Sequence, residues 1–485
     1  MSLNKKFLWP ALILLTLIAW PIVTYQGTSV VLVSVIGFSL LTIWLCSMLS
    51  QNISDEDRWV LLILAAGFLL KLLYIIYTNV GIRQHDVHSF AEDVNGHAGY
   101  IKYLLANGHL PDFDPREQFQ FYHPPVHHII SALWVKLNLA LGVAQEVCWE
   151  NIQILTLLYS SICMILMYRM LQELGFTGKA LLMGLTVFCF HPYFMFLAGS
   201  VNNDTLSVVF MMLTMLYTLR WAKKPTFKNI IILALAIGLG MSTKLSVAYL
   251  APATALVFLY KLLTTKGWVK ALLPQFVVFA IICVPLGVWW HVRCLVLFGL
   301  PLGYVPAITK NTYQYLGDTY SVWERFFDLS REQFEYLYIS FGGEGTTYAD
   351  HNILLTLLKS AVFEEQTLTR YNPLVKPASY VLFFSNLVLV GYSLWGMVRS
   401  RKRLDYPQQI TLYITYAIVF VSFIIFCFGF PHVCTQSYRY ITPTLFVGII
   451  GLASLWESGK KTRILDSAVI IFCIASTAQF LLLGL

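Results

Sequence analysis

Charged residues are scarce in this chain of 485 residues. The cysteine and histidine motifs that stabilise small domains through disulfides or zinc are missing. Only 12% of the residues are charged, against roughly 25% in an average soluble domain. The nine cysteines form no CxxC pair and no metal-type cysteine and histidine spacing, so neither a disulfide framework nor a zinc site is supported. We find no fixed-period repeat and no low-complexity tract. The low charge argues against a soluble globule, although the length would allow two or three soluble domains.

Long apolar runs take the place of the missing charge, and 58% of the residues are hydrophobic. Because a bilayer-spanning helix needs about 20 mostly apolar residues, we predict an all-α polytopic membrane protein with about 13 transmembrane helices. The first run follows Lys5 and Lys6 and lacks a clear cleavage site, so it is interpreted as a retained helix. The predicted spans are 7–25, 29–49, 59–80, 152–170, 180–198, 205–221, 229–241, 245–262, 271–291, 378–398, 409–429, 436–456 and 464–484.

Basic residues cluster in the short connections between these spans. Lys and Arg are enriched in cytoplasmic loops, so an arrangement that puts every basic loop on one side is favoured. This requires that 229–262 crosses twice and that 123–142 does not cross. The N-terminus is then cytoplasmic, and much of the net charge of +8 belongs to loops at the membrane and indicates no nucleic-acid partner. The loops concerned hold Arg169 and Lys179; Arg220, Lys223, Lys224 and Lys228; Lys261, Lys266 and Lys270; Arg399, Arg401, Lys402 and Arg403; Lys460, Lys461 and Arg463.

Two long segments remain on the outer side. In the first, 81–151, we expect helices near 90–107 and 124–142, the latter lying along the membrane interface. In the second, 292–377, we expect short helices and loops. The predicted organisation is two N-terminal helices in 1–58, a transmembrane core in 59–291 that includes the outer loop 81–151, the outer segment 292–377, and C-terminal helices in 378–485.

Asp86 follows the third span at the outer membrane surface. A carboxylate close to the bilayer is costly unless it is solvated, paired or functional, so Asp86 is either a solvated loop residue or a general base for a hydroxyl acceptor. Glu92 and Asp93 are the alternative carboxylates. Histidines crowd the same loop, but no fixed carboxylate completes a metal-ligand pattern, so we predict no metal site and leave a divalent metal requirement open. These histidines are His85, His97, His123, His127 and His128.

Three cations are predicted near the same side of the membrane. Lys244 interrupts an apolar stretch, while Arg293 and Arg439 lie beside aromatic residues at the ends of later spans. Each has an ordinary explanation as an interface anchor. Together they indicate an anionic ligand, because guanidinium groups bind phosphate with paired hydrogen bonds. Asn203 and Asp204 precede the span 205–221 and are interpreted either as helix caps or as part of a polar cavity.

Several short motifs occur in a fixed order between about residues 80 and 445, and the ordered set resembles the GT-C glycosyltransferases. The similarity is to bacterial relatives of the dolichyl-phosphate-mannose protein mannosyltransferases and to the lipid A aminoarabinose transferase. The motifs are His85-Asp86, Gly96-His97, Gly108-His109-Leu110-Pro111, Tyr122-His123-Pro124-Pro125, Val201-Asn202-Asn203-Asp204, Ser242-Thr243-Lys244-Leu245-Ser246, Trp289-Trp290-His291-Val292-Arg293, Phe298-Gly299-Leu300-Pro301 and Tyr438-Arg439-Tyr440-Ile441-Thr442-Pro443.

The resemblance implies an inverting transfer of sugar from a polyprenyl-phosphate donor to a hydroxyl acceptor, in a GT-C-like bundle. It implies Asp86 as the catalytic carboxylate, and Lys244, Arg293 and Arg439 as candidates for the donor phosphate. We expect His85, His97, His123, Asn203 and Asp204 as further substrate-binding candidates.

The implied partners are the lipid bilayer, a polyprenyl-phosphate-linked sugar and an acceptor that is a glycan, a lipid or a protein. The implied location is a bacterial inner membrane, with the active face outside the cytoplasm. Val87 after Asp86, and histidine before Pro124-Pro125 where the aminoarabinose enzymes have lysine, leave the donor and acceptor open. The main alternative is a transporter or flippase, which should show internal repeats and broken helices near the midplane. Glu344, Glu364 and Glu365 lie in the later outer segment and are interpreted either as acceptor contacts or as solvated loop residues, of which we favour the second.

Overall fold

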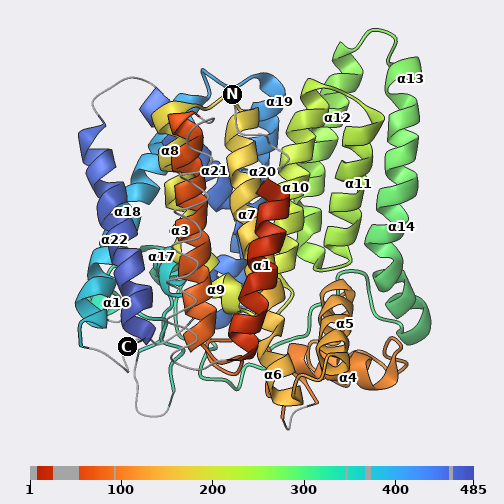
Figure 1. The fold of residues 1–485 in the computed structure, drawn as a ribbon, viewed down its shortest axis with the longest axis vertical. Coiled ribbons are helices and arrows are strands. Elements are labelled where there is room, and N and C mark those ends of the chain that lie inside the picture. Colours follow the sequence, from red (N-terminus) through yellow and green to blue (C-terminus); the bar gives the residue numbers. More distant parts are fainter. Residues whose placement is uncertain are drawn as a thin grey trace.

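Helices account for every regular element that the structure, a computed structural model, describes. The described residues are 8–25, 54–91, 94–335, 337–343, 348–365, 373–457 and 462–484. Most of the long helices run side by side along one axis (Figure 1). The prediction of an all-α polytopic membrane protein is confirmed.

The membrane-crossing helices follow the predicted apolar runs. Within the described residues, eight helices are long and apolar enough to cross a membrane, or nine if a bent pair counts as one span. The helices at three further predicted spans are shorter, and the predicted span 29–49 lies outside the described residues, so the count of about 13 is not confirmed. The bundle helices are α1 (Leu8–Thr24), α3 (Asp55–Tyr77), α7 (Ile152–Glu173), α8 (Gly178–Cys189), α9 (Pro192–Gly199), α10 (Asp204–Lys223), α11 (Phe227–Met241), η1 (Leu245–Leu250) continuing into α12 (Ala251–Thr264), α13 (Trp268–Ala271), α14 (Leu273–Phe298), α18 (Val375–Ser400), α19 (Tyr406–Gln409), η2 (Ile410–Ile414), α20 (Thr415–Gly429), α21 (Pro443–Glu457) and α22 (Arg463–Gly484).

One predicted span, 180–198, is broken into α8 and α9, which meet at an angle of 46°. Pro192 opens α9, and proline is tolerated there because the first N–H groups of a helix have no partner within it. Lys71 from α3 is fully buried beside this break and donates to the carbonyl oxygen of Cys189 at 3.4 Å. The lysine therefore satisfies a carbonyl group that the break leaves without its helical partner.

Short helices gather at one end of the bundle (Figure 1). The first outer loop contributes α4 (Gly96–Asn107), α5 (Val126–Ala140) and α6 (Gln145–Glu150), and the second contributes α15 (Glu324–Phe327), α16 (Arg331–Glu335) and α17 (Ile353–Phe363); two short 3₁₀ helices, η3 (Val433–Gln436) and η4 (Tyr438–Tyr440), precede α21. Two predicted starts are wrong. The helix expected from about residue 90 begins only at Gly96, and the helix expected from residue 124 begins at Val126.

The late start of α4 has a local cause at Gly96. This residue has a φ of +73°, and a Cβ there would come within 2.7 Å of the Asp86 carbonyl oxygen. The N–H groups of His97 and Ala98 donate to the carbonyl oxygens of Asp86 and Val87 at 3.0 and 2.9 Å. The N-terminus of α4 is therefore tied to the loop that carries Asp86.

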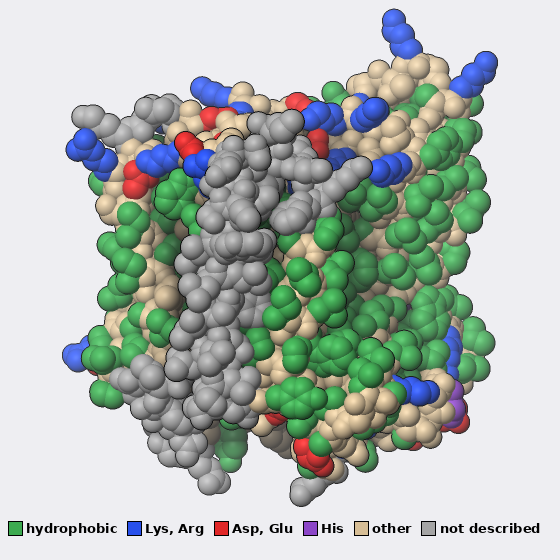
Figure 2. All heavy atoms as spheres, in the orientation of Figure 1, with side chains coloured by type: hydrophobic (Ala, Val, Ile, Leu, Met, Phe, Trp, Pro, Cys, Tyr) green, Lys and Arg blue, Asp and Glu red, His purple; other side chains and the backbone are tan. Residues whose placement is uncertain are grey.

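Lys and Arg side chains gather at the other end of the molecule, while the middle of the visible face is largely apolar (Figure 2). The short helices α4, α5 and α6 lie at the end away from this basic edge (Figure 1). This distribution matches the loops from which the sequence predicts the cytoplasmic side. The orientation itself stays a prediction.

Candidate active site

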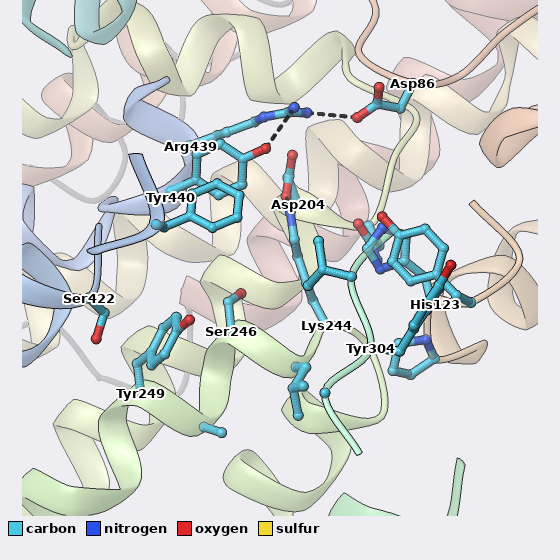
Figure 3. Close-up of a pocket in the computed structure, with 18 of the residues that line it drawn as sticks. Asp86, His123, Asp204, Lys244, Ser246, Tyr249, Tyr304, Ser422, Arg439 and Tyr440 are labelled. Carbon is cyan, nitrogen blue, oxygen red and sulfur yellow. Dashed lines mark hydrogen bonds and ion pairs between the residues drawn. The ribbon is translucent and has the colours of Figure 1, made fainter. Parts of the chain in front are cut away.

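A cavity of about 400 Å³ is lined by residues of α4 and of the loops beside it, and by residues of η1 and α20. It brings together residues far apart in the sequence, including Asp86, Lys244 and Arg439 (Figure 3). Of the other predicted site residues, His97, His123, Asn203 and Asp204 also line it. The far end is formed by Ser246 and Tyr249 of η1 and by Ser422 of α20 and its neighbours. The cavity thus joins charged groups near the loops to uncharged, partly apolar groups on membrane helices.

Asp86 is held in an unusual backbone conformation. Its φ is +56°, in the left-handed region that costs free energy for a residue with a Cβ. Besides the bonds to α4, Gln84, two residues before Asp86, fixes the loop: its amide donates to the Gly199 carbonyl oxygen at 2.8 Å and accepts from the Val201 N–H at 2.9 Å. The loop is therefore anchored on both sides of the carboxylate.

Arg439 forms an ion pair with Asp86 across the cavity wall. Its Nη1 lies 3.0 Å from the Asp86 Oδ2, and its Nη2 donates to the Tyr440 hydroxyl at 3.0 Å (Figure 3). Burial favours the neutral carboxyl, but Arg439 and then His85 outweigh it and lower the pKa of Asp86. Burial likewise opposes the charge on Arg439, yet Tyr440, Asp86 and Glu365 raise its pKa. Both groups are therefore charged at neutral pH.

Lys244 and Asp204 form a second ion pair in the same cavity (Figure 3). Of the two interpretations of Asn203 and Asp204, the helix cap is not observed, because α10 begins at Asp204 itself and Asn203 occupies the cap position without a side-chain capping bond. Instead, the Asn203 amide donates to the Thr243 carbonyl oxygen at 3.0 Å and ties α10 to the break before η1. The polar-cavity alternative describes this motif better.

Glu364 and Glu365 were expected to be solvated, and the structure contradicts this. Both side chains are less than 10% exposed; Glu364 pairs with His85, and the Glu365 Oε2 lies 3.4 Å from the His85 Nδ1. Glu365 Oε1 is also 3.8 Å from the Arg439 Nε. Glu344, Glu92 and Asp93 lie outside the described residues. The two glutamates therefore support His85 and Arg439 from behind the cavity wall.

The charge of His85 follows from these neighbours. Burial lowers its pKa, but Glu364 and then Glu365 overcome this and raise it to about 9, so the ring is a cation at neutral pH. Burial raises the pKa of Glu365. Ligand atoms of His85, Glu364 and Glu365 lie within 4.8 Å of one another, a spacing at which a metal ion could be held. In the structure these groups serve one another as ion-pair partners.

The histidines of the first outer loop other than His85 include three with stacked rings beside the cavity: His97, His123 and His128. The His97 and His128 rings stack with centroids 5.1 Å apart and share a hydrogen bond of 2.8 Å between Nδ1 and Nε2. Burial, the neighbouring histidines and, at His123, the nearby Lys244 lower the pKa of His97, His123 and His128 well below the usual value. His123 and His97 therefore offer neutral rings to a ligand rather than positive charge.

Arg293 is not brought into the cavity. Its Nη2 donates to the Pro111 carbonyl oxygen at 2.5 Å, and its guanidinium lies 5.3 Å from the centre of the Trp290 ring. Trp290 in turn donates to the Tyr122 carbonyl oxygen at 3.0 Å. Arg293 thus helps join α14 to the first outer loop, which places it apart from Lys244 and Arg439.

Residues 122–290 match the family of dolichyl-phosphate-mannose-protein mannosyltransferases. This confirms the predicted resemblance to GT-C glycosyltransferases and indicates a glycosyltransferase. The matched part contains the Tyr122-His123 motif, Asp204 and Lys244, while Asp86 and Arg439 lie on either side of it. No curated protein matches the chain at a significant level.

Three solved structures match the fold of this chain at low sequence identity and low TM-score. They are arabinofuranosyltransferase AftD from Mycobacteria (14% identity, 88% of this chain and 27% of that chain, TM-score 0.48), oligosaccharyltransferase AglB from Archaeoglobus fulgidus with an inhibitory peptide and a dolichol-phosphate (12%, 88% and 56%, 0.49), and ArnT from Cupriavidus metallidurans bound to undecaprenyl phosphate (13%, 84% and 80%, 0.38). This chain spans about a quarter of AftD and just over half of AglB.

Proposed function

We propose that this protein transfers a sugar from a polyprenyl-phosphate donor to a hydroxyl acceptor on the non-cytoplasmic face of its membrane, with inversion at the anomeric carbon. The observation that carries the proposal is the shared cavity of Asp86, Arg439 and Lys244. A carboxylate and two cations that meet in one hollow suit a reaction in which a proton is removed while a phosphate leaves.

The lining of the cavity fits a lipid-linked phosphate. Arg439 and Lys244 supply positive charge near the loops, and Tyr249 and Phe423 supply apolar surface at the far end. Since η1–α12 and α20 belong to helices long enough to cross the membrane, this end lies at lipid depth. A soluble nucleotide sugar would gain nothing from it, whereas a polyprenyl chain would remain in the bilayer while its phosphate reaches the cations.

The geometry supports a direct displacement. The acceptor oxygen attacks the anomeric carbon, the bond from that carbon to the phosphate oxygen breaks, and the polyprenyl phosphate leaves with the bonding electrons. Asp86 takes the acceptor proton, and Arg439 and Lys244 stabilise the charge that grows on the phosphate.

Arg439 links donor binding to the strength of the base. In the unliganded arrangement Arg439 lowers the pKa of Asp86, which makes the carboxylate a weak base. A phosphate that draws the guanidinium away would remove this effect. The base would then gain strength only when a donor is present.

The test compares cells that produce the intact protein with cells that produce Asp86→Asn. We expect the variant to fold, to accumulate polyprenyl-phosphate sugar, and to lose one sugar from a surface glycan, lipid or protein in mass analysis. Removal of a general base lowers turnover by roughly 10²–10⁴-fold. Asp112→Asn is the matched control, because Asp112 is an exposed carboxylate of the same outer loop and should leave the products unchanged.

The same samples separate transfer from transport. A flippase would move the lipid-linked sugar without breaking its phosphate bond, so the total amount of sugar attached to the lipid would not depend on Asp86. Normal product formation by purified Asp86→Asn protein would remove Asp86 from the chemistry.

A further inference from the structure

A second cavity, of about 370 Å³, lies at the opposite ends of three helices that line the cavity around Asp86, called the first cavity from here on. The helix α10 contributes its first residue, Asp204, to the first cavity and its last residue, Lys223, to the second. The spans η1–α12 and α19–α20 likewise line one cavity with each end. Since all three are long enough to cross a membrane, the two cavities belong to opposite leaflets.

The second cavity lies at the basic edge of the molecule. The helix α19, which forms one of its walls, is at the end away from α4 and α5, where Lys and Arg side chains gather (Figures 1 and 2). In the orientation predicted from the basic loops, this end faces the cytoplasm. The cavity therefore opens at the depth of the lipid headgroups of that leaflet.

The charged groups around the second cavity leave one positive charge in surplus. The Glu173 carboxylate pairs with two cations, the Arg220 Nε at 3.2 Å and the Lys223 Nζ at 3.1 Å. Asp405, on the opposite wall, caps the first turn of α19. Lys261 lines the cavity and forms no ion pair with any residue that the structure describes. Three cations thus meet two carboxylates, and one negative charge would balance them.

Exposed leucines of α12 lead along the helix to this charge. Leu256, Leu259 and Leu263 are 41%, 49% and 75% exposed, and their spacing of three and four residues places them on one face of the helix. Tyr260 and Thr264, each one position after a leucine of this stripe, line the cavity, so the cavity lies on the adjoining face. A molecule lying against α12 would meet apolar side chains along the span and positive charge at its end.

Two tyrosines mark the rim of the second cavity. The rings of Tyr260 and Tyr406 pack with their centroids 5.1 Å apart and join the end of α12 to the start of α19. Tyrosine is enriched where membrane helices meet the headgroups. A soluble anion would use the surplus charge alone, whereas a phospholipid would use the charge, the tyrosines and the leucine stripe together.

We propose that the second cavity binds the phosphodiester headgroup of a phospholipid, beside Lys261 and Lys223, with the acyl chains along the leucine stripe of α12. A phosphodiester carries one negative charge, which equals the surplus. Basic pockets between membrane helices are typical sites for lipid headgroups. The site takes no part in the sugar transfer and does not depend on the proposed function. A bound lipid would hold together the ends of three helices whose other ends form the first cavity.

Native mass spectrometry of the detergent-purified full chain tests this with three probes. Dioleoylphosphatidylglycerol has the phosphodiester and the chains, dioleoylglycerol lacks the phosphodiester, and glycerophosphoglycerol lacks the chains. We expect the intact protein to retain the first and to release the other two. Lys261→Gln should weaken retention of the phospholipid roughly fivefold, the usual effect of one basic side chain near the headgroups.

Two further variants separate the cavity from the general charge of the surface. Thr264→Trp places a large side chain at the exposed rim of the cavity without a change of charge, and it should also lower retention. Lys266→Gln is the matched control, because Lys266 is an exposed lysine that follows the same helix and does not line the cavity. This control should retain the phospholipid as the intact protein does.

Equal losses in Lys261→Gln and Lys266→Gln would assign the binding to diffuse surface charge and overturn the proposal. Unchanged retention in both Lys261→Gln and Thr264→Trp would overturn it as well. Retention of dioleoylglycerol as strong as that of the phospholipid would show that the phosphodiester is not recognised, and equally strong binding of glycerophosphoglycerol would identify a site for a soluble anion. Each of these results contradicts the lipid site and leaves the sugar-transfer test with Asp86→Asn unaffected.

Discussion

Two ion pairs formed by loop and short-helix residues show how similar chemistry can serve different purposes. Asp350 and Lys359 lie 2.6 Å apart, and both side chains are fully buried. Asp86 and Arg439 lie 3.0 Å apart, but the Asp86 side chain is 32% exposed and faces the first cavity. The first pair is sealed within the protein, whereas the second can exchange its partner for a ligand.

The two pairs also differ in how many hydrogen bonds their charged groups make. Asp350 also accepts from the Tyr348 hydroxyl at 2.8 Å and from the Ser340 N–H at 2.7 Å, so its carboxylate is saturated. Beside Asp86, the Arg439 Nε and the Glu365 Oε1 have no hydrogen bond within the described part of the chain. A saturated pair fixes loop structure. An unsaturated pair beside a cavity has capacity left for a substrate.

Replacing Arg439 should give the largest effect on turnover after the loss of Asp86. We expect Arg439→Ala to lower sugar transfer by roughly 10²–10³-fold, as for removal of one group that stabilises transition-state charge. Arg439→Lys should fall between this variant and the intact protein, because lysine keeps the charge but loses the paired hydrogen bonds. Turnover with a purified lipid donor measures both. Equal turnover of Arg439→Ala and the intact protein would break the comparison.

Breaking the sealed pair should instead cost stability. Lys359→Met leaves the buried Asp350 without its cation, and loss of one partner of a buried pair costs about 3–5 kcal/mol. Thermal unfolding in detergent should show a lower midpoint. The double variant Asp350→Asn with Lys359→Met should recover part of the loss. If Lys359→Met unfolds like the intact protein but transfers no sugar, the assignment of roles to the two pairs is reversed.

His85 should make the open site sensitive to alkali. Its pKa is raised from 6.5 to about 9 in the folded protein, so the folded state binds a proton more tightly than the unfolded state does. Its contribution to stability is therefore complete below pH 6.5 and is lost as the pH rises through about 9. Unfolding of His85→Gln should depend less on pH over this window. A pH dependence identical to that of the intact protein would exclude His85 as its source.

Arg293 offers the smallest expected effect. Since Arg293 does not line the first cavity, Arg293→Gln should change turnover by less than about tenfold, well below the loss of roughly 10²–10³-fold expected when a group that stabilises transition-state charge is removed. Arg439→Gln is the matched substitution and should cost far more. A loss in Arg293→Gln as large as that in Arg439→Gln would return Arg293 to the set of donor-binding residues.

Much of the helix arrangement could be predicted because lipid imposes a length on each apolar run. The break at Ser242–Lys244, and with it two separate helices, follows from polar residues inside such a run. The roles of polar residues were harder to predict. Asp204 has the sequence position of a helix cap, and only the fold reveals that Lys244 lies beside it.

The sequence predicts the site only in part, because the fold and not the local sequence decides which polar residues meet. Arg293 and Arg439 both stand beside aromatic residues, so local sequence could not separate the arginine that meets Asp86 from the one that meets the Pro111 carbonyl group. Glu364 and Glu365 lie 279 and 280 residues after His85 in sequence, and nothing near them indicates burial. In the sequence they are two adjacent glutamates directly after the apolar run that forms α17, a position that solvated loop residues share.

We expect the Asp86–Arg439 pair to open when a lipid phosphate binds. A cryo-electron microscopy structure of the full chain in nanodiscs with undecaprenyl phosphate tests it most directly. We predict the phosphate in the first cavity, hydrogen-bonded to Arg439 and Lys244, with the Arg439 guanidinium withdrawn from Asp86 and the polyprenyl chain passing between η1 and α20. A phosphate bound elsewhere, with the Asp86–Arg439 pair intact, would contradict the account.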